Sequence, residues 1–278
     1  MNLVLAIDQA FEPIAAVCIA SFLIHTRFDS LILVTPTNFN LTRIAFIAES
    51  YNTTLVHRPI PSDSVIYKLP VELQPYFYCI EALNQPSSGR YLYVDADTLC
   101  VSDLVALKQL SLDIYTPFAA CSHGRPMPDR SLILNLKTPY HYFNAGVFLF
   151  DSELIRSFVT PDAVIHFYLL NSALCRFREQ CALNALLHDR VKFLPGQYTL
   201  LNWMRKRQTG TRWHNLTVNS MAYCLEDVRD NMKIIHLSAG SLPYNIESSR
   251  HEQMDLYWLL VQSSLSRPSA IPRYSDLW

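Results

Sequence analysis

Apolar and polar positions along the chain form an alternating series of short and longer segments. Short apolar runs bounded by Pro, Asp, Asn or Ser are typical of buried strands, and longer runs with helical spacing are typical of helices. The strands predicted in this way are residues 1–7, 30–35, 54–58, 91–94, 142–150 and 232–237. The helices predicted between them are residues 13–25, 42–51, 70–84, 152–159, 162–177 and 180–188. This alternation predicts an α/β fold with an open, mostly parallel twisted sheet flanked by helices.

The pattern weakens after residue 244. We expect residues 1–245 to form a single domain, because no repeat or low-complexity linker interrupts them. Residues 246–278 are expected to add a C-terminal helix, at residues 251–263, and a proline-containing tail.

Composition limits the classes of protein that the chain can represent. Half of the 278 residues are hydrophobic and 17% are charged, which predicts a large core and little disorder. The net charge of -1 lacks the basic excess of a dedicated nucleic-acid binder, so we expect no nucleic-acid partner.

Cysteine usage and hydropathy bear on the compartment. The seven cysteines are odd in number and include no Cys-x-x-Cys pair, which favours reduced thiols in a cytoplasmic protein over disulfides or a zinc site. The apolar run at residues 17–24 is flanked by Glu12, Pro13 and His25 and is shorter than the roughly 20 residues that a bilayer requires. We therefore expect no transmembrane segment and no signal peptide.

A pair of carboxylates follows the strand predicted at residues 91–94. The run Tyr-Leu-Tyr-Val leads directly into Asp95 and Asp97. In open α/β sheets, ligands bind at the carboxyl ends of the strands. Two carboxylates at i and i+2 converge where a strand bends into a loop, and such oxygen ligands suit Mg²⁺ or Mn²⁺. The alternative is that both are solvated turn residues, since Asp is common where strands end.

Five short motifs occur in a fixed order along the chain. They are Ala6-Ile7-Asp8, Asp95-Ala96-Asp97, Phe143-Asn144-Ala145-Gly146, Glu179-Gln180 and His236. In order and spacing they resemble family 8 of the retaining glycosyltransferases, which has the GT-A fold and includes bacterial lipooligosaccharide galactosyltransferases and glycogenin. The resemblance covers about residues 1–244. It implies a Rossmann-like nucleotide-binding half and a UDP-sugar as donor.

The resemblance implies a donor site made of residues from all parts of the domain. Its expected members are Ala6, Ile7, Asp8, Phe11, Tyr78, Asp95, Ala96, Asn144, Ala145, Gly146, Ala239 and Leu242. Asp8 would hydrogen-bond the uracil ring and Phe11 would stack on it, although Asp8 is also a good helix N-cap and Phe11 an ordinary core aromatic. Asn144 would bind sugar hydroxyls, and the small Ala145 and Gly146 would let the sugar approach the backbone; the alternative for this segment is a β-bulge.

The same resemblance implies a metal site and two catalytic residues. Asp95, Asp97 and His236 would hold Mn²⁺ or Mg²⁺, and the ion would offset charge on the departing diphosphate. Glu179 would hold sugar hydroxyls, and Gln180 would lie beside the anomeric carbon. Because a glutamine is a poor nucleophile, this favours front-face substitution through an oxocarbenium-like transition state. The alternative is that both residues simply begin a helix.

Several positions depart from the family pattern. Tyr78 stands where Lys or Arg is usual, and Ala239 and Leu242 replace the glycine and lysine of the closing motif. Cys181 stands where an acidic residue commonly follows. Loss of these cations removes contacts to the diphosphate.

The leading hypothesis is a metal-dependent retaining glycosyltransferase. It would move a hexose, galactose or glucose, from a UDP-sugar to a glycan, glycolipid or protein acceptor, as in lipopolysaccharide biosynthesis, in the cytoplasm or at the inner face of a membrane with weak peripheral contact. The alternative is a nucleotide-sugar-binding GT-A module with little or no turnover, because Tyr78 and Leu242 replace the usual cations. A phosphatase of the haloacid-dehalogenase type is disfavoured, because Leu99 stands at its Thr or Val position and the chain has no Asp-Asp pair.

Overall fold

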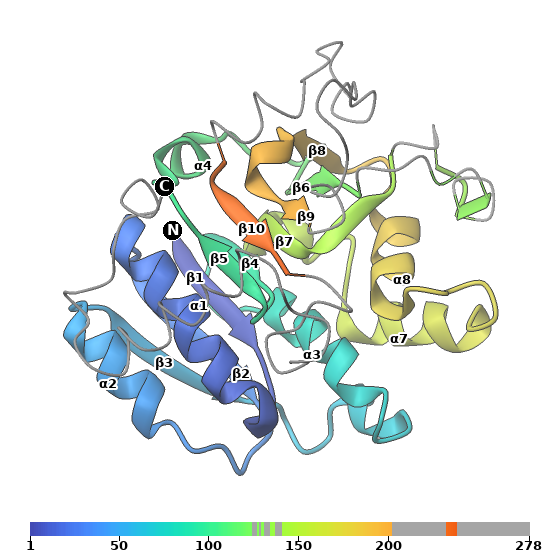
Figure 1. Ribbon diagram of the computed structural model, residues 1–278. Helices are drawn as coiled ribbons and strands as arrows, with labels where there is room; N and C mark the ends of the chain where they lie inside the picture. The colour runs from blue at the N-terminus through green and yellow to red at the C-terminus, as the bar shows by residue number, and fades with distance from the viewer. Residues whose placement is uncertain (124–126, 128, 131–133, 137–140, 202–231, 238–278) are drawn as a thin grey trace, which may run out of the picture.

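A seven-stranded sheet forms the centre of the computed structural model, which describes residues 1–123, 127, 129–130, 134–136, 141–201 and 232–237 (Figure 1). Its strands are β1 (Asn2–Ala6), β2 (Ser30–Thr35), β3 (Thr54–Pro59), β4 (Arg90–Val94), β6 (Phe118–Ser122), β7 (Phe143–Asp151) and β8 (Val191–Leu194). They lie in the order β3-β2-β1-β4-β7-β6-β8. β7 runs antiparallel to β4 and β6, while the other neighbouring pairs are parallel. The predicted α/β fold with a mostly parallel sheet is confirmed.

A second, three-stranded sheet lies beside the first. It has the order β5-β10-β9 and consists of β5 (Thr98–Cys100), β10 (Ile234–His236) and β9 (Leu200–Leu201). β10 is antiparallel to β5 and parallel to β9. This sheet joins the carboxylate turn after β4 to a strand that lies far along the sequence.

Helices cover both faces of the main sheet. The side chains of α1 (Glu12–His25) and α2 (Thr42–Ser50), with the region of α4 (Val105–Gln109), pack into one core. The side chains of α3 (Gln74–Leu83), α6 (Ser152–Ile155), α7 (Pro161–Leu170) and α8 (Arg178–Leu187) pack into the other. Three 3-10 turns complete the described elements: η1 (Gln9–Phe11), η2 (Val65–Lys68) and η3 (Gly196–Tyr198).

The alternation of side chains along the central strands accounts for the two cores. Along β4, Leu92 and Val94 point into the first core, and Tyr91 and Tyr93 into the second. Strands buried on both faces have near-continuous apolar sequences, which is why the residues of β1, β2, β4 and β7 could be predicted as strands. The ring of Tyr93 stacks on that of Phe148 in β7, with centroids 4.5 Å apart.

Some predicted elements are corrected by the structure. The helix predicted at 162–177 ends at Leu170, where Asn171 caps it and donates from its side-chain amide to the carbonyl of Phe167. The helix predicted at 152–159 is the short α6, and a new helix begins after the N-cap Thr160. The strands β5, β6, β8 and β9 were not predicted.

The C-terminal tail, the length of the helices and the cysteines were also subjects of prediction. The tail at 246–278, with its helix at 251–263, lies outside the described residues. None of the helices in the described part of the chain is long and apolar enough to cross a bilayer. The six cysteines within the described residues are free and buried.

Candidate metal and nucleotide-sugar site

The candidate site lies where the carboxyl end of β4 meets the amino end of β7. Because the two strands are antiparallel, with Val94 opposite Val147, the residues that follow β4 lie beside the first residues of β7. The backbone N–H of Asp95 donates to the carbonyl of Gly146 at 2.7 Å. Two motifs that are about fifty positions apart in the sequence therefore touch.

The Asp95 turn is held by hydrogen bonds from three elements. The hydroxyl of Thr98 donates to the Asp95 carbonyl at 2.7 Å, which closes the turn into β5. The thiol of Cys18, from α1, donates to the same carbonyl at 3.6 Å. The phenol of Tyr93 donates to Asp95 Oδ1 at 2.8 Å, so this carboxylate oxygen is held by a hydrogen bond within the protein.

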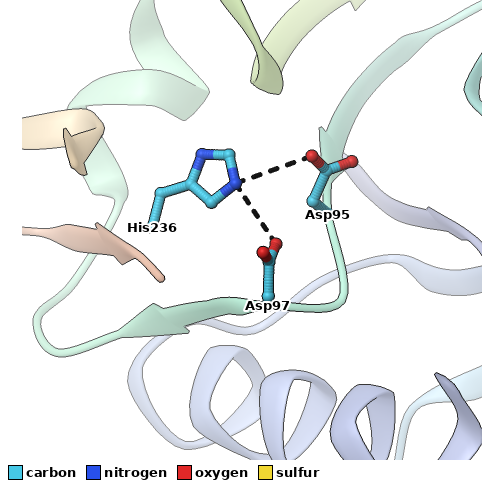
Figure 2. A group of neighbouring side chains, drawn as sticks. All are labelled: Asp95, Asp97 and His236. Atoms are coloured by element: carbon cyan, nitrogen blue, oxygen red, sulfur yellow. Dashed lines mark ion pairs between the residues drawn. The ribbon is translucent and has the colours of Figure 1, made fainter. Parts of the chain in front are cut away.

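His236 reaches the two carboxylates through the small sheet. Its strand, β10, pairs with β5, and His236 lies opposite Thr98. Its Nε2 is 3.6 Å from Asp95 Oδ2 and 3.2 Å from Asp97 Oδ1, and Figure 2 shows the ring edge turned toward both. The sequence pattern predicts residues 232–237, which include His236, as a strand of a single open sheet. The structure corrects this, because the histidine belongs to the second sheet.

These three side chains fit a divalent cation. One ligand atom from each lies within 4.8 Å of the others. Two carboxylates and an imidazole are a suitable donor set for such an ion, and the side chain of Asp95 remains 39% exposed. Asp95, Asp97 and His236 thus form a candidate metal site.

The electrostatics of the group favour an added positive charge. Partial burial raises the pKa of Asp95 to about 6; the charge of His236 opposes this rise, and the charge of Asp97 adds to it. Burial lowers the pKa of His236, but the facing carboxylates of Asp97 and Asp95 outweigh it and the pKa lies above its usual value. The two neighbouring carboxylates repel each other and favour the protonated form of His236. A bound cation would reduce this repulsion.

Gly146 makes room for this arrangement. A Cβ at this position would lie 2.1 Å from His236 Cε1 and 2.6 Å from Asp95 Oδ2. The groups that approach the Gly146 backbone are therefore side chains of the protein itself. The predicted approach of a sugar to Ala145 and Gly146 stays a prediction.

Residues predicted to bind the nucleobase lie around the end of β1. Oδ1 of Asp8 accepts from the backbone N–H groups of Ala10 and Phe11 at 3.0 and 3.1 Å, so Asp8 does cap η1, as its alternative reading held. Tyr78 is 5% exposed, and burial, together with Tyr67 and Asp8, raises its pKa. Tyr78, which stands where the family pattern has a cation, is thus a buried residue of α3.

The other predicted members of the donor site differ in burial. Ala6 ends β1 and is partly buried, Ile7 and Ala96 are buried, and Phe11 is partly buried against the core of α1 and α2. Ala239 and Leu242 lie outside the described residues. Because β1 is parallel to β4 and β7 is antiparallel to it, the candidates that follow β1 and β4 and those that begin β7 lie at the same edge of the sheet. The contacts of all candidates with a donor stay predictions.

The start of α8 lies against the first residues of β7. Oε1 of Gln180 accepts from Asn144 Nδ2 at 3.2 Å and from the Ala145 N–H at 3.0 Å. Oε2 of Glu179 is buried and has no hydrogen-bond partner among the described residues. Burial raises the pKa of Glu179 to about 8, and the charge of Asp95 adds to the rise. Burial therefore favours the protonated form of Glu179.

Two residues that hold the surrounding elements in place, and are not proposed to contact a metal or a donor, were not predicted from the sequence. Tyr93 holds Asp95, and Asn184 joins α8 to β7: its side chain accepts from the Phe143 N–H at 2.7 Å and donates to the Phe143 carbonyl at 3.0 Å. Asn184 follows Gln180 by one helical turn, so the shared helix face was a usable signal. Tyr93 looked like an ordinary core residue, because a strand pattern does not reveal where a phenol points.

The described fold is that of the GT-A class of glycosyltransferases. The chain matches the model of Glycosyl transferase family 8 over residues 2–243 and belongs to this family. Both the resemblance inferred from the motifs and the GT-A fold are thereby confirmed.

The similar solved structures agree with this fold. One is the galactosyltransferase LgtC in complex with donor and acceptor sugar analogues, with a TM-score of 0.74 at 14% identity. The alignment covers 95% of this chain and 96% of the LgtC chain. Another is the glycosyltransferase GlyE of Streptococcus pneumoniae TIGR4, with a TM-score of 0.68 at 17% identity. The alignment covers 97% of this chain and 62% of the GlyE chain.

One curated relative is similar in sequence. General stress protein A of Bacillus subtilis (strain 168) is 26% identical over 186 residues, which are 64% of this chain. The aligned part spans 60% of the length of that relative.

Proposed function

We propose that this glycosyltransferase is a metal-dependent, retaining hexosyltransferase. It would move galactose or glucose from a UDP-sugar to a glycan, glycolipid or protein acceptor. The observation that carries the proposal is the convergence of Asp95, Asp97 and His236 within 4.8 Å, beside the end of β1 and the start of α8. Family membership supports glycosyl transfer in general, and the donor set supports Mn²⁺ or Mg²⁺.

The residues around the candidate metal site would bind the donor in three parts. Asp8 and Phe11 would contact the uracil ring, and Tyr78 stands where the family pattern has a cation for the diphosphate. A bound divalent ion would act as a Lewis acid that offsets charge on the leaving diphosphate. Glu179 and Asn144 would contact the hydroxyls of the sugar. In its protonated form, which burial favours, Glu179 would donate a hydrogen bond to a hydroxyl as well as accept one.

The contacts of Gln180 support front-face transfer. Its carbonyl oxygen already accepts from two donors, Asn144 Nδ2 and the Ala145 N–H, which hold it in the protein. An oxygen used in this way is a poor nucleophile. Gln180 would therefore orient groups near the anomeric carbon and stabilise charge there, without forming a covalent intermediate.

A ligand screen tests the proposal. UDP, GDP, UDP-galactose and UDP-glucose are added to the protein with and without Mn²⁺, and the melting temperature is recorded. We expect the UDP compounds to stabilise the protein only when Mn²⁺ is present, and UDP release in a coupled assay to follow with a suitable acceptor. Nuclear magnetic resonance of the product would show the retained anomer. Absence of any Mn²⁺-dependent stabilisation by UDP compounds would contradict the proposal.

A second candidate is a nucleotide-sugar-binding module with little or no turnover. The buried Tyr78, in place of a cation, favours it, because the leaving diphosphate then has one positive contact fewer. The screen separates the two candidates: a binding module would show the Mn²⁺-dependent stabilisation but release no UDP above the rate of the D97N variant.

Two further proposals concern the acceptor and the compartment. LgtC was solved with an acceptor sugar analogue, which supports a carbohydrate acceptor here. The free buried cysteines of the described residues are in keeping with the cytoplasm. We accordingly propose that the protein acts in lipopolysaccharide synthesis, at the inner face of a membrane with which it makes weak peripheral contact. Glycosylation of lipooligosaccharide fragments by the purified protein would test it.

A further inference from the structure

A chain of hydrogen bonds joins the candidate metal ligand His236 to helix α8. His236 Nδ1 lies 3.1 Å from Asn144 Oδ1. Asn144 Nδ2 donates to Gln180 Oε1 at 3.2 Å. The three side chains are buried, with exposed fractions of 4% for His236, 7% for Asn144 and 8% for Gln180. Water has little access to replace these partners.

Two backbone N–H groups fix the direction of every bond in this chain. The Gly146 N–H donates to Asn144 Oδ1 at 3.0 Å, so this atom must be the amide oxygen. The Ala145 N–H donates to Gln180 Oε1 at 3.0 Å, so this atom must be an oxygen as well. A backbone N–H can only donate, and neither amide can therefore be turned over. It follows that His236 Nδ1 bonds to Asn144 as a donor.

This direction determines what the other ring nitrogen can offer. When Nδ1 carries the proton of a neutral imidazole, Nε2 presents its lone pair. Nε2 is the atom that faces Asp95 Oδ2 and Asp97 Oδ1 (Figure 2). The ring is thus held in the form and the orientation that a cation between the two carboxylates requires.

We propose that Asn144 is a positioning residue for metal binding, which acts by accepting the Nδ1 proton of His236 and so turns Nε2 toward the ion. The inference rests on the proposed function for the presence of that ion. It also gives Asn144 a task other than the sugar contact expected from the family resemblance. Without the acceptor, an ion-bound imidazole would leave its Nδ1–H buried without a partner.

The test measures Mn²⁺ binding directly, in the presence of UDP. Free Mn²⁺ is titrated by electron paramagnetic resonance against the wild type, N144A and N144D. We expect N144A to bind Mn²⁺ about 10- to 100-fold more weakly, as is usual when the partner of a metal-bound histidine is removed. N144D keeps an acceptor oxygen for His236 and is expected to remain within about threefold of the wild type or to bind more tightly.

A matched control separates positioning from general destabilisation. Asn184 is an equally buried amide that bonds to Phe143 and to the Gln180 carbonyl, and none of its bonds involves His236. N184A is expected to lower the melting temperature but to keep the Mn²⁺ affinity of the wild type. Pulsed paramagnetic resonance adds a direct signature: the ¹⁴N coupling of the coordinated imidazole should weaken in N144A at saturating Mn²⁺ and persist in N184A and N144D.

The outcomes distinguish the two proposals. If the wild type binds no Mn²⁺ in the presence of UDP, the proposed metal-dependent function is refuted, and this inference with it. If the wild type binds Mn²⁺ but N144A binds it equally well with an unchanged ¹⁴N coupling, the role of Asn144 alone is refuted. If N144D fails as badly as N144A while folded, the acceptor oxygen is not what matters and the inference is also overturned.

Discussion

Adding a single methyl group at Gly146 should remove metal binding. A Cβ at this position would lie 2.1 Å from His236 Cε1, 2.7 Å from His236 Nδ1 and 2.6 Å from Asp95 Oδ2. Carbon atoms in contact are about 3.5–4.0 Å apart, so the imidazole would have to retreat by roughly 1.4 Å or more. The Gly146 backbone does not have a positive φ, so alanine is excluded by these neighbours and not by its own conformation.

The displacement is large compared with what a metal site tolerates. Distances between an ion and its ligands must stay within about 0.2 Å of their usual values. We therefore expect G146A to bind Mn²⁺ more than about 100-fold less tightly than the wild type, which exceeds the effect of losing a partner of a ligand. Overpacking of this kind costs about 1–3 kcal/mol of the free energy of unfolding.

The assay combines Mn²⁺ titration by electron paramagnetic resonance with unfolding in guanidinium chloride. G89A is the control, because a Cβ there would meet Tyr91 Cε2 only at 3.8 Å, although the φ of Gly89 is +147°. It should lose stability through its backbone and keep its affinity for Mn²⁺. In the H236A background the ring is gone, so most of the stability loss caused by G146A should disappear.

Two results would refute the reasoning about Gly146. One is a G146A variant with the Mn²⁺ affinity of the wild type, since the ring could then not be where the structure has it. The other is an equal stability loss on adding G146A to the wild type and to H236A, which would assign the loss to something other than contact with His236.

Three further variants test other parts of the site. D97N replaces a proposed carboxylate ligand by a neutral amide and should weaken Mn²⁺ binding more than about 100-fold with little change in melting temperature; normal binding, measured by calorimetry, would remove Asp97 from the metal site. Y93F deletes the donor to Asp95 and should lose about 1–2 kcal/mol of stability together with Mn²⁺ affinity, whereas the control Y91F, whose phenol bonds to Ser87, should lose stability alone. Glu179 has a raised pKa of about 8, against an ordinary 4.5. Its contribution to the free energy of unfolding is therefore fully present below pH 4.5 and is lost as the pH rises through 8. E179Q in metal-free buffer should therefore flatten the fall in stability between these two values, by at most about 5 kcal/mol, and an unchanged denaturation profile across this pH range would contradict the assignment.

Local sequence patterns predicted the central strands because those strands are buried on both faces. They failed for β6, whose sequence Phe-Ala-Ala-Cys-Ser has no β-branched residue and forms a strand because β7 and β8 lie on its two sides. β8 is a four-residue edge strand that includes Lys192 and makes too short a pattern to read. In these segments the tertiary neighbours, and not the local sequence, decide the structure.

The candidate site was predictable to different degrees. Asp95 and Asp97 are adjacent to a strong strand signal, so their chemistry could be inferred from the sequence. His236 could be selected only through the family resemblance, because the pairing of β10 with β5 joins segments more than a hundred positions apart and leaves no local trace. The smallness of Gly146 indicated a close approach, but the sequence could not say that the approaching group is an imidazole of the same chain.

The antiparallel strand β7 explains how such a site can be built in a mostly parallel sheet. Parallel strands bring only their carboxyl ends to the ligand-binding edge. β7 runs the other way, so its first residues arrive there beside Asp95. They bring the backbone N–H groups of Ala145 and Gly146, which fix the amides of Gln180 and Asn144. The same reversal that supplies space for His236 at Gly146 thus also supplies the donors that determine how the ring of His236 is oriented, and a sheet without it would need other side chains for both tasks.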